Sequence, residues 1–231
     1  MKPYVICHMN ASVDGRILGS RWRPSENRMA GLFERIHEEL GGGSWLIGRV
    51  TGSEYAKAQT YPSQTDQTYP RHPWFAQRDA KAYGIALDAE GKIAWGRSDI
   101  GGDPVVAVLS KQVSDAHLTG LRQDHVSYIF AGERELDLGL ALEILNRELG
   151  IERLLLEGGG GSNGAFLRAG LIDEISLAIC PAVDGAKGAP SIFDSSDRDA
   201  GVPAPVTSMT LASCEVLAGG AVWLRYRLQN G

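Results

Sequence analysis

The stretch Leu154-Leu155-Leu156-Glu157-Gly158-Gly159-Gly160-Gly161-Ser162-Asn163-Gly164 decides how this chain is interpreted. Three leucines predict a buried strand, and a short helix is expected from Gly164 to Ala169. Glycines let a backbone approach an anion closely, and the free N–H groups at a helix start donate to its oxygens. The stretch therefore predicts a phosphate site in which Gly159 and Gly160 tolerate no side chain. A tight turn without a ligand is the alternative.

Gly159, Gly161 and Gly164 also match the G-x-G-x-x-G pattern of dinucleotide-binding folds, and Asp184 follows about 20 residues later. That pattern should open the first strand-helix-strand unit of the fold. Here it lies late, and the chain that remains is too short to complete such a fold. We therefore set this interpretation aside.

Strands and helices are expected to alternate on both sides of the glycine run. Strands are predicted over Pro3–Met9, Trp45–Ile47, Pro104–Leu109, Ser127–Ala131, Arg153–Leu156, Ile175–Ile179 and Val222–Arg227. Helices are predicted over Ser25–Leu40, Ala116–Leu121 and Leu138–Leu149. A hairpin is expected from Tyr83 to Trp95, and a long loop or lid over Gln59–Pro73. The alternation predicts an α/β fold with antiparallel strands near the C-terminal end.

The composition of the chain is that of a globular protein. The chain has 231 residues, an apolar content of 43% and a formal net charge of −5. These values favour one globular domain over residues 1–231 and argue against disorder and nucleic-acid binding. No apolar run is long enough to span a bilayer. Cys7, Cys180 and Cys214 form no C-x-x-C pair, and the five histidines lack metal-ligand spacing, so we expect no metal and a cytoplasmic location.

Three segments together resemble the dihydrofolate reductase fold. Ile47–Thr51, Val108–Lys111 and Glu157–Ser162 look like its three NADPH-binding segments in order and spacing. Met9–Ile17, with its S-x-D-G pattern, resembles more closely the riboflavin-biosynthesis pyrimidine reductase family, the C-terminal domain of bifunctional deaminase-reductases. Three further matches to that family are Leu155–Gly159, Gly170–Glu174 and Cys180-Pro181.

The resemblance implies a central, mostly parallel sheet with flanking helices, usually in a homodimer. It implies NADPH-dependent reduction of 5-amino-6-(5-phosphoribosylamino)uracil to the ribitylamino form, or action on a related substrate. The cofactor residues it implies are Gly48, Arg49, Val50, Thr51, Ser110, Lys111, Gly158, Gly159, Gly160, Gly161 and Ser162. The substrate residues are Asn10, Ser12, Asp14, Glu54 and Glu157, of which Asp14 and Glu157 are the catalytic candidates.

Each cofactor candidate has a structural alternative. Arg49 could hold a phosphate through charge-assisted hydrogen bonds or be a solvated surface residue. Thr51 is expected to cap the helix that follows. Ser110 and Lys111 could meet the adenosine 2′-phosphate, or could simply end a strand.

The two acids also have structural alternatives. Glu157 could deliver a proton beside the nicotinamide or accept hydrogen bonds from its own turn. Asp14 could bind sugar hydroxyls or stabilise a turn. We expect both carboxylates to face one cleft.

The chain departs from the family after the first NADPH segment, where an Asp-x-Pro is common. Thr51-Gly52-Ser53-Glu54-Tyr55-Ala56 stands here, and Glu54 could replace the acid. Two other functions are therefore kept. A pterin reductase would need an acid on the first helix, such as Glu34 or Glu38, and a non-catalytic NADPH-binding module would need no substrate acid.

Overall fold

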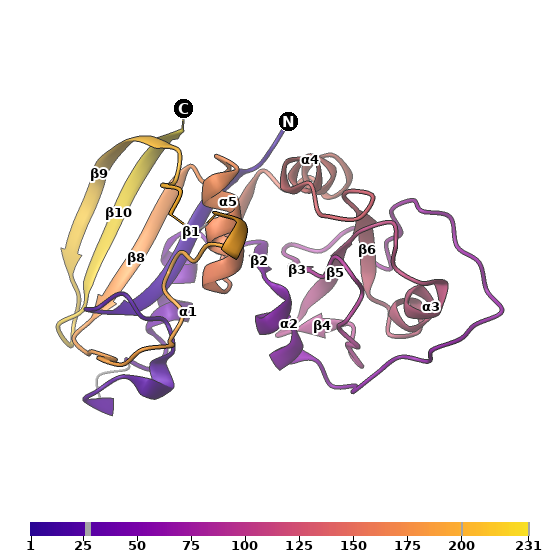
Figure 1. Ribbon diagram of the computed structural model, residues 1–231, viewed down its shortest axis with the longest axis horizontal. Coiled ribbons are helices and arrows are strands. Elements are labelled where there is room, and N and C mark those ends of the chain that lie inside the picture. The colour runs from indigo at the N-terminus through magenta and orange to yellow at the C-terminus, as the bar shows by residue number, and fades with distance from the viewer. Residues whose placement is uncertain (26–28, 200, 231) are drawn as a thin grey trace. The chain divides into compact units, whose positions relative to one another are not determined.

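The computed structural model describes residues 1–25, 29–199 and 201–230 (Figure 1). The chain divides into two compact units. Residues 1–3 and 43–154 form the first unit, and residues 4–42 and 155–231 form the second. None of the helices in the described ranges is long and apolar enough to cross a membrane.

The first unit is built on parallel strands. Strand β3 (Gly84–Leu87) lies between β2 (Trp45–Ile47) and β5 (Asp103–Leu109), and β6 (Ser127–Phe130) pairs with the other side of β5. The short β4 (Asp99–Ile100) pairs antiparallel with the start of β5. Val105 to Leu109 are fully buried, which agrees with a central parallel strand. Helices α2 (Arg49–Tyr55), α3 (Asp115–Gln123) and α4 (Leu138–Leu149) belong to this unit.

The second unit combines parallel and antiparallel strands. Strand β1 (Tyr4–Ser12) runs parallel to β8 (Glu174–Cys180), with Ile6 opposite Glu174. Strands β10 (Val222–Asn230) and β9 (Val206–Val216) continue antiparallel from β8. Among its described residues, helices α1 (Leu32–Glu39) and α5 (Gly160–Arg168) and the short 3₁₀ turns η1 (Gly19–Arg21) and η3 (Asp197–Asp199) also belong to this unit. Strand β7 (Arg153–Leu156) carries the chain from one unit into the other.

The predicted fold class is confirmed: strands and helices alternate, and the antiparallel strands follow at the C-terminal end. Helix α4 has the predicted bounds: Ala141, Leu142, Ile144 and Leu145 form its buried face, and Gly150 ends it in the left-handed conformation.

Two local predictions were wrong. The helix expected from Ser25 begins only at Leu32, because Met29 and Gly31 have positive φ angles; Glu26 to Arg28 lie outside the described residues. The expected hairpin is absent, since β3 pairs in parallel on both sides. The Asp88 carboxylate then accepts hydrogen bonds from the backbone of Lys92 and Ile93 and holds the chain as a loop.

The segment Gln59–Pro73 is a loop, as predicted, and it packs along α3 (Figure 1). The Tyr61 hydroxyl donates to Asp124 at 2.6 Å, and Thr119 on α3 contacts Thr65 at 3.1 Å. A Cβ on Gly120 would collide with the Tyr61 ring, so the absence of a side chain there admits the ring. These contacts make the segment a fixed strap, in contrast to the lid that its composition suggested.

Candidate functional site

The glycine run forms the start of α5. Gly159 is its N-cap with φ 61°, a conformation that glycine adopts without strain, and the helix begins at Gly160. It thus begins four residues earlier than predicted. No side chain of the described residues caps this end, so N–H groups of the first turn remain available to an anion.

The glycines of the run differ in what surrounds them. A Cβ added to Gly160 would collide with the Ser191 carbonyl oxygen, and one on Gly164 would collide with the Asp194 carbonyl oxygen. A Cβ on Gly161 would meet no atom within 4 Å. Gly160 therefore tolerates no side chain because of packing within the protein, and its role towards a phosphate stays a prediction. Gly161 is the position that faces open space.

Glu157 links β7 to the glycine run and pairs with His37 on α1. Its Oε1 lies 2.7 Å from His37 Nδ1, and the side chains are 8% and 17% exposed. Burial raises the pKa of Glu157, the hydrogen bond and charge of His37 lower it, and Glu34 raises it. Glu157 is thus a buried acid with a side-chain partner, which differs from a carboxylate bonded to its own turn.

His37 was missed as a site residue, because the five histidines were considered only as possible metal ligands. Its partner is 120 residues away in the sequence, and only the fold brings the two together. No local spacing signals such a pair.

The chain after β1 carries Asp14, which is exposed and fully engaged in hydrogen bonds. Its Oδ1 accepts from Ser12 Oγ at 2.6 Å and from the Asp184 amide at 3.0 Å, and its Oδ2 accepts from the Gly185 amide at 2.9 Å. These bonds hold the pKa of Asp14 well below its usual range. The structural role considered for Asp14 is therefore present, and its role towards a substrate stays a prediction.

Asn10 lies near the end of β1, two residues before Ser12. Its Oδ1 is buried and has no hydrogen-bond partner among the described residues. Buried polar atoms are usually satisfied, so an unpaired one next to a candidate site is the expected mark of a missing ligand or water.

In the first unit, α2 follows β2 directly. Gly48 is the N-cap and the helix begins at Arg49, so the prediction that Thr51 caps it was wrong: Thr51 lies within the first turn. Arg49, Val50 and Glu54 are exposed, and Thr51 is half-buried.

Ser110 and Lys111 follow the carboxyl end of β5. Ser110 is 1% exposed, whereas Lys111 is accessible and forms an ion pair with Glu133 at 2.5 Å. Arg71 of the strap donates to the Lys111 and Val113 carbonyl oxygens and pairs with Asp115. Arg71 therefore holds the loop that carries Lys111 in place.

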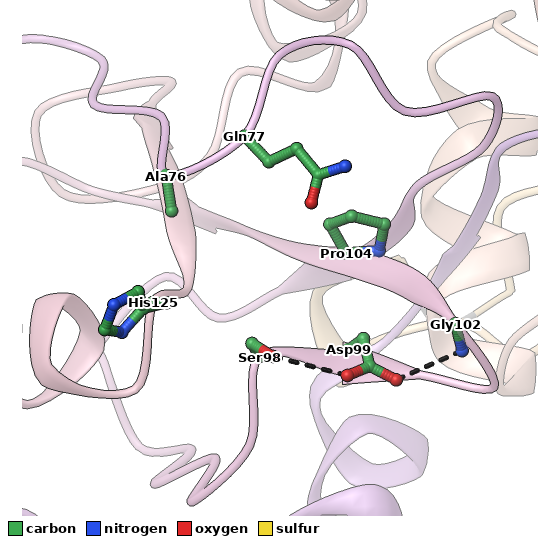
Figure 2. Close-up of a pocket in the computed structure, with 7 residues that line it drawn as sticks. All are labelled: Ala76, Gln77, Ser98, Asp99, Gly102, Pro104 and His125. Carbon is green, nitrogen blue, oxygen red and sulfur yellow. Dashed lines mark hydrogen bonds between the residues drawn. The ribbon is translucent and has the colours of Figure 1, made fainter.

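A pocket of about 370 Å³ lies elsewhere in the first unit (Figure 2). Pro104 at the start of β5, His125 before β6, and Asp99 line it. Because β5 runs from Asp103 to Leu109, this pocket lies at the opposite end of that strand from Ser110. It is distinct from the candidate cofactor residues.

Residues 3–223 match the family described as the RibD C-terminal domain. The chain belongs to that family. A 2,5-diamino-6-ribosylamino-4(3H)-pyrimidinone 5′-phosphate reductase of Methanothermobacter thermautotrophicus is 36% identical over 96 residues, 42% of this chain and 44% of the relative. A reductase of the same name from Aquifex aeolicus is 24% identical over 192 residues, 83% of this chain and 82% of the relative. The first match thus spans less than half of that relative.

Several solved structures share the fold of this chain. A pyrimidine reductase-like protein of Corynebacterium diphtheriae superposes with a TM-score of 0.70 at 16% identity, over 99% of this chain and 93% of that one. A riboflavin biosynthesis reductase of Saccharomyces cerevisiae gives a TM-score of 0.60 at 18% identity, over 99% and 90% of the two chains. At such identities the likeness shows the fold alone.

Proposed function

We propose that this RibD-family protein is an NADPH-dependent reductase that converts a ribosylaminopyrimidine 5′-phosphate into its ribitylamino form. The observation that carries the proposal is the buried acid Glu157 placed directly before the open N-terminus of α5. An anion site next to a proton donor is what reduction with a phosphate-bearing cofactor requires.

The cofactor residues that we propose fall into two groups. In the second unit, Gly158–Ser162 would hold the pyrophosphate, and the open space at Gly161 fits this role. In the first unit, Gly48–Thr51 and Ser110–Lys111 would bind the remaining phosphate groups. Arg49 and Lys111 are accessible cations, which supports NADPH over NADH, since only NADPH carries a 2′-phosphate. When bound, the cofactor supplies hydride.

The chain's own residues would position and protonate the substrate. Hydride is accepted at the sugar carbon of a C=N bond in the ring-opened ribosylamine, and the π electrons move to nitrogen, which takes a proton. Glu157 would provide that proton, because burial favours its protonated form. Asn10, Ser12, Asp14 and Glu54 would bind the sugar or the base through their polar side chains.

The substrate is the ribosylaminopyrimidine whose ring is either a 5-aminouracil or the 2,5-diaminopyrimidinone that the relatives are named for. An assay of NADPH oxidation tests this with both compounds, a pterin and a small carbonyl. Turnover of a ribosylaminopyrimidine supports the proposal. Turnover of pterin alone favours a pterin reductase, and NADPH binding without any turnover favours a non-catalytic module.

We also propose a cytoplasmic homodimer. Among the described residues, strand β9 pairs with β10 alone and forms an edge of its sheet. It carries the exposed apolar side chains of Met209, Leu211 and Val216, and an exposed strand edge of this kind is a ready template for a second copy. The three free cysteines fit a reducing compartment. Sedimentation of the wild type and of a Leu211→Lys variant tests the assembly, since the variant should be monomeric.

A further inference from the structure

His37 and Glu157 form a pair of acid and base side chains inside the second unit. His37 lies in the last turn of α1, and Glu157 follows β7 directly. The 2.7 Å separation of Nδ1 and Oε1 is that of a short hydrogen bond. His37 is the more exposed of the two, at 17% against 8%.

We propose that His37 is a positioning residue that engages Oε1 of Glu157, so that the carboxyl group delivers its proton from Oε2. This proposal rests on the proposed catalytic role of Glu157. Oε2 accepts no hydrogen bond from the described residues, so one oxygen is fixed by the protein and the other is left for the substrate.

Among the groups around Glu157, His37 is the one that offsets the effect of burial on the pKa of Glu157. Glu34, on helix α1 like His37, raises the pKa of Glu157. The buried Cys7 thiol on β1 also interacts with Glu157, and it is uncharged. His8, also on β1, bonds to the Phe33 carbonyl and the Ser176 hydroxyl, so it is held away from such a role. Within the described part of the chain, only His37 lowers the pKa of Glu157.

The consequence for the reaction follows from the proton balance. In the step, the O–H bond at Oε2 breaks, an N–H bond forms on the substrate, and Glu157 is left as a carboxylate. A buried carboxylate without a donor is costly, so the hydrogen bond from His37 lowers the cost of reaching this state. Solvent then returns one proton to Glu157, which restores its acid form.

The test compares His37→Leu, which removes the donor, with His37→Asn, whose amide N–H can occupy the place of Nδ1. We expect His37→Leu to lower kcat about tenfold, the lower end for a hydrogen bond to a charged group, with NADPH Kd unchanged. The pKa of Glu157 should rise in this variant. Because Glu157 acts in its protonated form, the limb on which kcat falls with increasing pH should move to higher pH. His37→Asn should restore most of both effects.

Carboxyl ¹³C NMR of labelled glutamate measures the same pKa without turnover, and Glu157→Gln identifies the signal. If Glu157→Gln keeps full kcat, the proposed function of Glu157 fails whatever His37 does. If Glu157→Gln loses kcat while His37→Leu shifts neither the limb nor the NMR titration, the inference about His37 alone is wrong. If His37→Leu does not fold, His37→Gln replaces it, because the Gln amide reaches the place of Nε2 and not that of Nδ1. Equal behaviour of the Asn and Gln variants would overturn the proposal.

Discussion

Asp194 donates its backbone N–H to the carbonyl oxygen of Gly160 at 2.9 Å, and its carboxylate lies where a Cβ of Gly160 would project. The first turn of α5 is therefore backed by the segment from Ser191 to Asp194. Asn163 strengthens this contact, since its amide donates to the Ile192 carbonyl at 3.0 Å. One side of the glycine run is thus closed by protein, and Gly161 is on the open side.

Substitutions at these two glycines should separate folding from cofactor binding. Gly161→Ala should fold with an unchanged melting temperature and weaken NADPH about tenfold, because its methyl group would enter only the space proposed for the pyrophosphate. Gly160→Ala should lower the melting temperature by about 2–12 °C, the cost of overpacking. Calorimetry and fluorescence titration measure both. Normal NADPH binding by Gly161→Ala would contradict the phosphate site.

The preference for NADPH should depend on Arg49 and Lys111. Each charged phosphate contact contributes about 1.5–3 kcal/mol, so the double alanine variant should bind NADPH and NADH with similar affinity. Glu133→Gln is the control: it frees Lys111 from an exposed ion pair and should leave the preference in place, since such pairs contribute little. Equal binding of the two cofactors by the wild type would refute the prediction.

The parts of the fold that could be predicted are those encoded by local periodicity. Four leucines on one face specified α4, and an unbroken apolar run specified β5. Strand β9 was missed because it is largely exposed, so its sequence lacks the alternation that marks a half-buried strand. The hairpin predicted after β3 was wrong because the Asp88 carboxylate accepts hydrogen bonds from the Lys92 and Ile93 amides. The turn residues in the sequence do not reveal this contact.

The candidate site was predictable to a similar extent. The glycine run and Glu157 are contiguous, so their joint role could be inferred from the sequence. His37 and the Ser191–Asp194 segment contact them from distant parts of the chain, and their contribution appears only after folding.

Glu157→Gln should keep NADPH affinity and lower kcat about 10²-fold, the lower end for general acid catalysis. The amide retains the shape and a hydrogen bond to His37 but cannot deliver a proton. Steady-state kinetics with a ribosylaminopyrimidine, together with fluorescence titration of NADPH, measure the two quantities. A loss of NADPH affinity as large as the loss of kcat would show that Glu157 acts through the cofactor site.

Asp14→Asn should mainly raise KM, because it changes a contact formed before and during the reaction. It should also lower the melting temperature, since an amide offers one acceptor oxygen where the carboxylate accepts from both Asp184 and Gly185. Ser12→Ala provides the stability reference: it removes one hydrogen bond to the same carboxylate and leaves its charge. Because Ser12 is itself a proposed substrate residue, only its melting temperature is compared. If Asp14→Asn lowers stability as Ser12→Ala does and leaves KM unchanged, Asp14 is purely structural.

His8 should make the stability of the protein depend on pH. Its ring is completely buried, and burial lowers its pKa to about 4. In the unfolded chain the pKa of histidine is about 6.5, so between pH 4 and 6.5 the unfolded state binds more protons than the folded state. This contribution is therefore fully present above about pH 6.5 and is lost as the pH falls towards 4, which amounts to about 2–3 kcal/mol at pH 4.5. Urea unfolding of the wild type and of His8→Gln at pH 7 and 4.5 measures it: the variant should lose less stability over this interval, and an equal loss in both proteins would show that His8 is protonated in the folded state.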